Sequence, residues 1–277
     1  MKQEFDRTIL ITGVSSGIGL GMTKTLLDAG YRVFGSVRKN DRARELRREL
    51  GDRFHPLVFD VCSEDQLERA YTEVDSALAG HHLHALINNA GGAEIGPLLE
   101  VSPESFLRQL DTLVVGQLRV IQKFFPMLVS TGASPGKVFN ISSVSGVGVN
   151  RFFGCYAAGK HALEGLSKTL REELRMYGVR VIVIAPANIK TNIWPKPTDE
   201  ILERYKNTDY AKALTEYVRM LPAKISANAM TVDEYCAAFY EIFREPNPSN
   251  RYTIFKGKRW KRPFSRLSRL KVRVLRS

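Results

Sequence analysis

Short apolar runs alternate with longer helical patterns along most of this chain, and this alternation constrains the fold more than any other feature. The apolar runs are rich in β-branched residues and apolar on both faces, which is typical of strands buried in a parallel sheet. We expect strands at 8–12, 32–37, 54–59, 85–88, 137–142 and 180–185. We expect helices to begin near Gly17, Asp41, Ser63, Ser102 and Tyr156. This order predicts an α/β fold, one doubly wound parallel sheet with helices on both faces.

Local signals indicate where two of these helices begin and where two end. Ser63 and Gln66 have the spacing of a capping box, and Ser102 precedes a proline at the first helical position. Gly30 and Gly178 stand where helices must turn back towards strands. The boundaries of the predicted elements therefore agree with their hydrophobic patterns.

The net charge of +12 is concentrated at the C-terminal end of the chain. From Arg251 onward there are 11 Lys/Arg and no Asp/Glu, which leaves 30 basic and 29 acidic residues in positions 1–250. A nearly neutral body argues against a nucleic-acid-binding face, so we expect no nucleic-acid partner. We assign residues 1–257 to one catalytic domain and residues 258–277 to a basic tail.

The basic tail has a helical pattern of its own. Pro263 can open a helix that separates an apolar side (Leu267, Leu270, Val274) from a basic side (Arg266, Arg269, Arg273, Arg276). A basic amphipathic helix suits the surface of an anionic membrane, which predicts peripheral membrane contact. A solvated tail, or one docked on the body through its leucines, is an alternative of equal weight.

Cysteine and histidine usage gives little sign of a metal or disulfide site. Three cysteines (Cys62, Cys155, Cys236) are too few and too scattered for a disulfide framework, and the odd count favours a reducing, cytoplasmic compartment. An HHxH pattern at 81–84 lies in a predicted turn without a partnering cluster, so we expect no metal site. No apolar run reaches about 18 residues, and we expect neither a spanning helix nor a secretory signal.

The sequence TGVSSGIG at 12–19 directly follows the first predicted strand and opens the first helix. Its three glycines let the backbone turn tightly and approach a pyrophosphate, and the helix N-terminus offers free N–H groups to the phosphates. A plain strand-to-helix turn is the alternative, and the placement between strand and helix makes it the weaker one. We therefore predict a dinucleotide held by Gly13, Ser15, Ser16, Gly17, Ile18 and Gly19.

The end of the second predicted strand bears on which dinucleotide is bound. A site that prefers NAD usually places a carboxylate here for the ribose 2′-hydroxyl, and the sequence reads Ser36-Val37-Arg38-Lys39 instead. Arg38 offers a planar cation suited to a 2′-phosphate, so we predict NADP(H), with a solvated arginine as the alternative. Asp60, at the end of the third predicted strand, is expected to accept a hydrogen bond from the adenine amino group.

Tyr156 and Lys160 are four residues apart and share one face of a predicted helix. An ammonium near a phenol favours the phenolate and brings the tyrosine pKa towards the working range of a general acid/base. Ser143, just past the fifth predicted strand, could polarise a substrate carbonyl. The YxxxK pattern alone is common, so its meaning depends on the other motifs.

Those motifs occur together in the order of a known family, and the chain resembles a short-chain dehydrogenase/reductase from about Thr8 to about Tyr252. They are TGVSSGIG at 12–19, Asp60-Val61, NNAG at 88–91, Ser142-Ser143, YAAGK at 156–160 and IAPANIKT at 184–191. The resemblance implies a Rossmann-type fold in which Tyr156 is the general acid/base, Lys160 holds the nicotinamide ribose and Ser143 binds the substrate oxygen. It also implies that the cofactor contacts Val61, Asn89, Ala90, Gly91, Pro186, Ile189 and Thr191.

Two positions depart from the family pattern. Leu113 stands where the family usually has the asparagine that orders a proton-relay water, and Ala187 follows Pro186 where a glycine is usual. The three catalytic residues are all present, which favours an enzyme. Leu113 favours a rival interpretation, a catalytically weak cofactor-binding regulator or scaffold.

The resemblance also indicates the substrate and the assembly. Residues 192–230 correspond to the family's substrate-covering insert, and their aromatic and apolar content suggests a bulky hydrophobic alcohol or ketone. A helix pair packed on the body is an equally weighted alternative. Arg251-Tyr252 is similar to the steroid- and retinol-type members, which favours a lipid-like substrate. Family members dimerise through the helices that begin near Ser102 and Tyr156, so we expect a homodimer or homotetramer.

Overall fold

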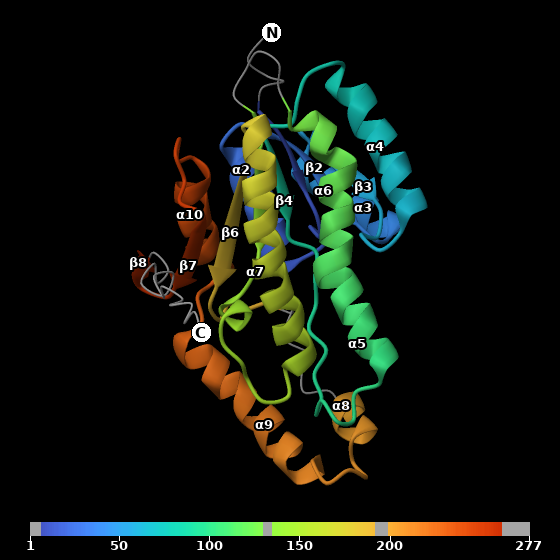
Figure 1. Ribbon diagram of the computed structural model, residues 1–277, viewed down its shortest axis with the longest axis vertical. Helices are drawn as coiled ribbons and strands as arrows, with labels where there is room; N and C mark the ends of the chain where they lie inside the picture. The colour runs from blue at the N-terminus through green and yellow to red at the C-terminus, as the bar shows by residue number, and fades with distance from the viewer. Residues whose placement is uncertain (1–6, 130–134, 192–198, 262–277) are drawn as a thin grey trace, which may run out of the picture.

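A computed structural model describes residues 7–129, 135–191 and 199–261, and it contains one eight-stranded sheet (Figure 1). The strand order is β3-β2-β1-β4-β5-β6-β7-β8, and every neighbouring pair is parallel except β7 with β8. The strands are β1 (Thr8–Ile11), β2 (Arg32–Val37), β3 (Phe54–Val58), β4 (Ala85–Asn88), β5 (Lys137–Ile141), β6 (Arg180–Pro186), β7 (Arg251–Phe255) and β8 (Lys258–Lys261). The chain reverses its direction of travel across the sheet between β3 and β4, so the carboxyl ends of β1 and β4 flank a crevice.

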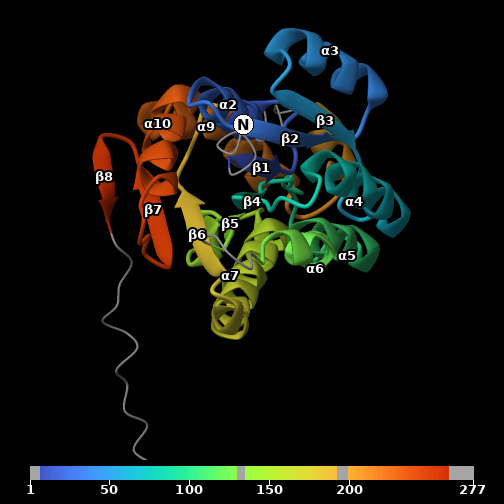
Figure 2. The same ribbon diagram turned by 90° about the horizontal axis from the view of Figure 1, so that it is seen from above.

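Helices cover both faces of the sheet, as predicted (Figure 2). One layer contains α2 (Gly17–Asp28), α3 (Asn40–Leu50) and α10 (Val232–Phe243). The other contains α4 (Glu64–Leu78), α5 (Pro103–Leu110), α6 (Gly116–Phe124) and α7 (Gly154–Leu174). Because side chains alternate along a strand, Ile9 and Ile11 of β1 pack in the first core and Leu10 packs in the second. Strands buried on both faces explain why the predicted runs were apolar throughout.

Short helices connect or extend the main elements. A π-helical turn, η1 (Asp111–Val115), joins α5 to α6. The 3₁₀ turns are η2 (Phe125–Met127), η3 (Val144–Gly146) and η4 (Arg175–Tyr177). Two further helices, α8 (Asp199–Arg204) and α9 (Ala211–Asn228), lie beyond the carboxyl ends of the strands (Figure 1).

The six predicted strands are confirmed to within one residue at each end, but β7 and β8 were not predicted. Arg251–Phe255 begins with a cation and carries a tyrosine and a threonine, and Lys258–Lys261 contains three cations, so neither has the continuous apolar pattern of most of the other strands. The sheet therefore runs to Lys261, four residues into the segment assigned to the tail. The helix predicted from Pro263 lies outside the described residues.

The capping signals are confirmed with one change. Ser102 accepts a hydrogen bond from the N–H of Ser105 at 3.2 Å. Ser63 likewise accepts one from the N–H of Gln66, but the Gln66 amide oxygen accepts from the N–H of Asp60 at 2.7 Å instead of closing the box. Ser63 therefore makes only one of the two hydrogen bonds of a capping box. The Gln66 side chain instead holds the backbone just after β3.

The apolar residues of the predicted substrate insert form a small core of their own. Tyr205, Leu214, Val218 and Leu221 pack with Ile95, Phe152 and Phe153 in a cluster separate from the two cores on the faces of the sheet. Among the described residues, no helix is long and apolar enough to cross a bilayer.

Candidate active site

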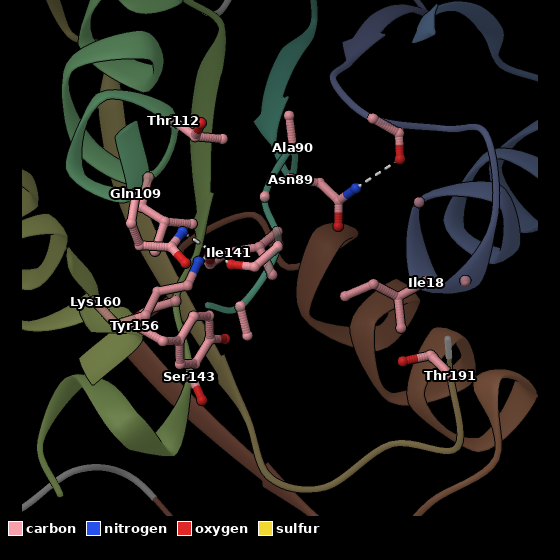
Figure 3. Close-up of a pocket in the computed structure, with 18 of the residues that line it drawn as sticks. Ile18, Asn89, Ala90, Gln109, Thr112, Ile141, Ser143, Tyr156, Lys160 and Thr191 are labelled. Atoms are coloured by element: carbon pink, nitrogen blue, oxygen red, sulfur yellow. Dashed lines mark hydrogen bonds between the residues drawn. The ribbon is translucent and has the colours of Figure 1, made fainter. Parts of the chain in front are cut away.

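A cavity of about 650 Å³ opens at the carboxyl ends of the parallel strands (Figure 3). Every residue predicted to bind cofactor or substrate lines it. They are Gly13, Ser15, Ser16, Gly17, Ile18, Gly19, Arg38, Asp60, Val61, Asn89, Ala90, Gly91, Ser143, Tyr156, Lys160, Pro186, Ile189 and Thr191. In Figure 3, Ser143, Tyr156 and Lys160 lie on one side of the cavity, and Ile18 and Thr191 lie on the other.

The glycine loop has the geometry that a pyrophosphate requires. Gly13 has φ +72°, a left-handed conformation that favours glycine. A Cβ on Gly19 would lie 2.2 Å from the carbonyl oxygen of Gly13, so only glycine lets α2 start so close to the loop. The N-cap residue Ser16 makes no side-chain cap bond. The first N–H groups of α2 therefore need a partner at the cavity, which a phosphate supplies.

Asn89 ties the loop after β4 to the glycine loop. Its amide nitrogen donates to the carbonyl oxygens of Thr12 and Gly13 at 2.9 and 3.0 Å. In return, the N–H groups of Asn89 and Ala90 both donate to the Thr12 hydroxyl at 2.9 Å. These four bonds hold the two loops that flank the crevice in a fixed relative position.

The adenosine end of the cavity contains Arg38 and Asp60. Arg38 is exposed at the end of β2, where its guanidinium can meet a 2′-phosphate. One Asp60 carboxylate oxygen accepts from the N–H of Cys62 at 2.9 Å, and the Asp60 N–H is held by Gln66. The carboxylate that we expect to meet the adenine amino group is thus fixed by its own backbone surroundings.

The end of the cavity that carries the predicted catalytic residues combines three side chains from two elements. Tyr156 and Lys160 lie on α7, and Ser143 is the N-cap of η3, where its hydroxyl accepts from the N–H of Ser145 at 3.1 Å. Burial raises the pKa of Tyr156, and its hydrogen bond with Ser143 opposes that rise. The pKa of Tyr156 is thus raised by burial and not lowered by Lys160 as predicted, and Tyr156 and Ser143 both line the cavity.

Lys160 is buried beneath the tyrosine ring. Its ammonium donates to the carbonyl oxygen of Ile141 at 2.7 Å and lies 5.7 Å from the centroid of the Tyr156 ring. Burial lowers the pKa of Lys160 to about 8, and the Glu164 carboxylate one turn further along α7 opposes the shift. Burial and the Glu164 carboxylate thus act in opposite directions on the charged form of the lysine.

Leu113, the departure from the family pattern, is completely buried in the π-helical turn η1. A Cβ on Gly91 would lie 2.8 Å from its Cδ2 atom, and a Cβ on Gly159 would lie 2.8 Å from its Cδ1 atom. The leucine therefore fills the space between the loop after β4 and the helix that carries Tyr156.

Gln109 is a structural residue of the site that the sequence interpretation missed. Its side chain is 8% exposed, donates to the carbonyl oxygen of Gly92 at 3.1 Å and accepts from the N–H of Glu94 at 2.6 Å. It fixes the loop that leads from β4 to α5. The signal was available, because Gln109 is a polar residue at the helical spacing that places it on one face with Phe106 and Leu113. Other lining residues that were not predicted include Phe59, Gly92, Ala93, Glu94, Ser105, Arg108, Thr112, Ile141, Val144, Ser145, Asn150 and Asn188.

No described residue of α8 or α9 lines this cavity. Tyr205 packs instead against Gly96, where a Cβ would lie 2.3 Å from the phenol oxygen, and Tyr217 stacks edge-on against Phe152 at 5.3 Å between ring centroids. The described side chains of Tyr205 and Tyr217 thus pack on the body, and the substrate-covering role of the insert stays a prediction. Ile193 and Trp194 lie outside the described residues. In the part of the chain that is described, no group of three or more His, Cys, Asp or Glu side chains could hold a metal ion.

Comparisons of the sequence and of the structure with known proteins point to the same family. The sequence profile described as short chain dehydrogenase matches residues 7–201. The chain is 34% identical over 250 residues to an NADPH-dependent 3-dehydrocapnine reductase of Ornithobacterium rhinotracheale, a match that covers 90% of this chain and 88% of that protein. It is 33% identical over 208 residues to mouse estradiol 17-beta-dehydrogenase 2, covering 72% of this chain and 54% of the relative. A Burkholderia cenocepacia short chain dehydrogenase solved in complex with NADP has the same fold, with a TM-score of 0.68, 23% identity and coverage of 89% of this chain and 87% of that one.

Proposed function

The chain belongs to the short-chain dehydrogenase family, and on that premise we propose that it is an NADP(H)-dependent oxidoreductase that interconverts a hydrophobic secondary alcohol and its ketone. One observation carries the proposal. Ser143, Tyr156 and Lys160 converge at one end of a cavity whose other end is the glycine loop at the start of α2. Hydride chemistry needs this arrangement, because a proton donor must face the carbon that exchanges hydride with the cofactor.

Each catalytic side chain has a role that its surroundings support. When bound, the nicotinamide supplies hydride to the carbonyl carbon or takes it from the carbinol carbon. Ser143 donates a hydrogen bond to the substrate oxygen, and Tyr156 gives that oxygen its proton in reduction or takes it in oxidation. Lys160 would hold the ribose hydroxyls of the bound cofactor, and Pro186, Ile189 and Thr191 would line the site of its carboxamide. A raised Tyr156 pKa keeps the phenol protonated before reduction.

Two observations support NADP(H) as the cofactor. Arg38 is an exposed cation that lines the adenosine end of the cavity, at a strand end without a carboxylate. The relative that covers most of the chain is named as NADPH-dependent, and a fold relative was solved with NADP.

The substrate class rests on the relatives and on one motif. The names of two relatives refer to 3-dehydrocapnine and to estradiol, and the Arg251-Tyr252 pair is similar to the steroid- and retinol-type members. We therefore propose a steroid-, retinoid- or lipid-like substrate. A homo-oligomer in the cytoplasm, with the basic tail on a membrane surface, is the setting that we propose for it.

A panel of steroid, retinoid, long-chain keto and sugar substrates, followed by NADPH absorbance, tests this function. We expect turnover of one or more apolar ketones, loss of that turnover in Tyr156→Phe, and nearly unchanged NADPH affinity in that variant. Tyr240→Phe, outside the cavity, is the matched control. Substantial turnover without the Tyr156 hydroxyl would refute the assignment. NADPH binding without turnover of any substrate would favour the rival, a cofactor-binding regulator, for which Leu113 is the motivating observation.

A further inference from the structure

A buried ion pair lies directly behind the catalytic side chains. Glu164, one turn after Lys160 on α7, is 6% exposed. Its two carboxylate oxygens accept from Arg251 Nε at 3.1 and 2.9 Å, and one of them also accepts from the Ser142 hydroxyl at 2.8 Å. The side chains of Arg251 and Glu164 are only 14% and 7% exposed. This carboxylate is therefore held by two partners away from water.

Such a pair needs an explanation other than stability. Removing two charges from water costs several kcal/mol per ion, and the attraction between them commonly does no more than offset that cost. The Arg251 side chain is also not fully satisfied: Nη1 donates to the Thr253 hydroxyl at 2.7 Å, but Nη2 is buried without a hydrogen-bond partner. An apolar pair would fill the same space more cheaply.

The position of the pair suggests what it does. Ser142 immediately precedes Ser143 at the end of β5, Glu164 lies on the helix that presents Tyr156 and Lys160, and Arg251 begins β7. The pair thus links three separate elements at one point. The turn η3 packs directly onto it, since a Cβ on Gly146 would lie 2.7 Å from Ser142 Oγ and 2.9 Å from Glu164 Cγ.

We propose that Glu164 and Arg251 form a positioning pair that, through the Ser142 hydroxyl, holds the backbone of Ser143 in register with Tyr156 and Lys160 on α7. This inference rests on the proposed oxidoreductase function and assigns a further residue pair to the same site. Neither member of the pair lines the cavity. They can therefore act on cofactor and substrate only through the geometry of Ser143, Tyr156 and Lys160, and we expect the chemical step to be affected more than binding.

The pair has a second, electrostatic consequence. The charged groups around Glu164 are Lys160 and Arg171 on its own helix and Arg251 on β7, whereas Ser142 of β5 and Ser145 of η3 are neutral. The Glu164 carboxylate favours the charged form of Lys160 against the effect of burial. Removing that carboxylate would let Lys160 lose its proton at lower pH.

Glu164→Gln, Ser142→Ala and Arg251→Met test the proposal, with Glu173→Gln on the exposed face of α7 as the matched control. We expect kcat to fall about 10- to 100-fold in Glu164→Gln, in line with the cost of a small misplacement of reacting groups. KM and NADPH affinity should stay within about threefold, and the alkaline decline of kcat should move to lower pH. Ser142→Ala removes the link to Ser143 but leaves the Glu164–Arg251 ion pair intact. It therefore tests the proposal even if Glu164→Gln and Arg251→Met fail to fold.

Hydrogen exchange supplies a readout that does not depend on activity. Amides of residues 142–146 should exchange about tenfold faster or more in Glu164→Gln and Ser142→Ala, and at the normal rate in Glu173→Gln. A wild-type protein without any turnover would refute the proposed function, but the exchange rates would still test the positioning pair. Unchanged exchange, or unchanged kcat in an active protein, would overturn it.

Discussion

The side chain of Leu113 occupies the space that a side chain at position 159 would need, since a Cβ on Gly159 would lie 2.8 Å from Leu113 Cδ1. The two residues come from η1 and α7, which pack against each other. The leucine at the family's asparagine position and the glycine in YAAGK are therefore two parts of one packing arrangement.

From this contact we expect Leu113→Asn to lower stability and bring no gain in turnover. The change replaces buried methyl groups with an amide, and an unsatisfied buried polar group costs about 1–3 kcal/mol. Denaturant unfolding measures the loss, with Leu113→Met as a control of similar volume. A rise in kcat would show instead that a missing proton relay limits this protein.

A double variant tests the coupling between the two positions. Gly159→Ser alone should be destabilising, because its Cβ meets Leu113, whereas a smaller residue at 113 relieves that clash. We expect Leu113→Asn/Gly159→Ser to be less destabilised than the sum of the single variants, by about 1 kcal/mol. Strict additivity would contradict direct packing.

Arg38→Asp should shift cofactor preference from NADP towards NAD. The variant removes a charge-assisted phosphate contact, worth about 1.5–3 kcal/mol, so NADP affinity should fall tenfold or more. It also places a carboxylate where the ribose 2′-hydroxyl of NAD can meet it. Lys39→Asp makes the same charge change at the adjacent residue, which does not line the cavity. It should change the affinity for NADP much less. Equal affinity of the wild type for NAD and NADP would contradict this prediction.

The stability of the nucleotide-free protein should depend on pH through Lys160. Its pKa is lowered to about 8 in the folded chain, from the model-peptide value of about 10.4. Between these values the unfolded chain binds more protons than the folded one, so the free energy of unfolding rises with pH. Relative to Lys160→Met, the wild type should gain about 2–3 kcal/mol from pH 7 to pH 10. Parallel stability curves for the two proteins would show that Lys160 titrates normally.

Assembly can be tested on the outer face of α5. Leu107 is 62% exposed, and Leu98 and Leu99 just before the helix are also exposed. We expect light scattering at micromolar concentration to show a dimer or tetramer, and Leu107→Asp to shift it towards a monomer. Val58→Asp on β3 introduces the same charge at another exposed apolar residue and should leave the assembly unchanged. A monomeric wild type would contradict the expected oligomer.

The basic tail calls for a binding experiment. We expect the full chain to co-sediment with anionic vesicles in a salt-sensitive manner and a chain ending at Lys261 to lose that binding, since each cation near the headgroups contributes about 1 kcal/mol. The shortened chain keeps β8, so the sheet is unaffected. Equal sedimentation of both proteins would show that the tail is not a membrane anchor.

The sequence predicted the elements whose signals are local. The run at 180–185 reads as a strand because its apolar pattern needs no partner to be recognised, and the glycine loop is identified by spacing alone. Contacts between distant segments were beyond such reasoning. Nothing near Glu164 in the sequence indicates that Arg251, 87 positions away, is its partner, or that Gln66 would bond to Asp60. Leu113 could be identified as unusual, but its neighbours could not be named.

The strand order places two groups of cavity-lining residues in two different parts of the chain. Arg38, Asp60 and the glycine loop come from the first three strands, whereas Ser143, Tyr156, Lys160 and Thr191 follow the later ones. We therefore expect the preference for NADP or NAD and the reaction chemistry to depend on different stretches of sequence. Exchanging residues 8–62 for the matching stretch of an NAD-dependent relative should therefore change cofactor preference and keep the reacting groups, provided that the bonds from Asn89 and Ala90 to Thr12 and Gly13 are kept.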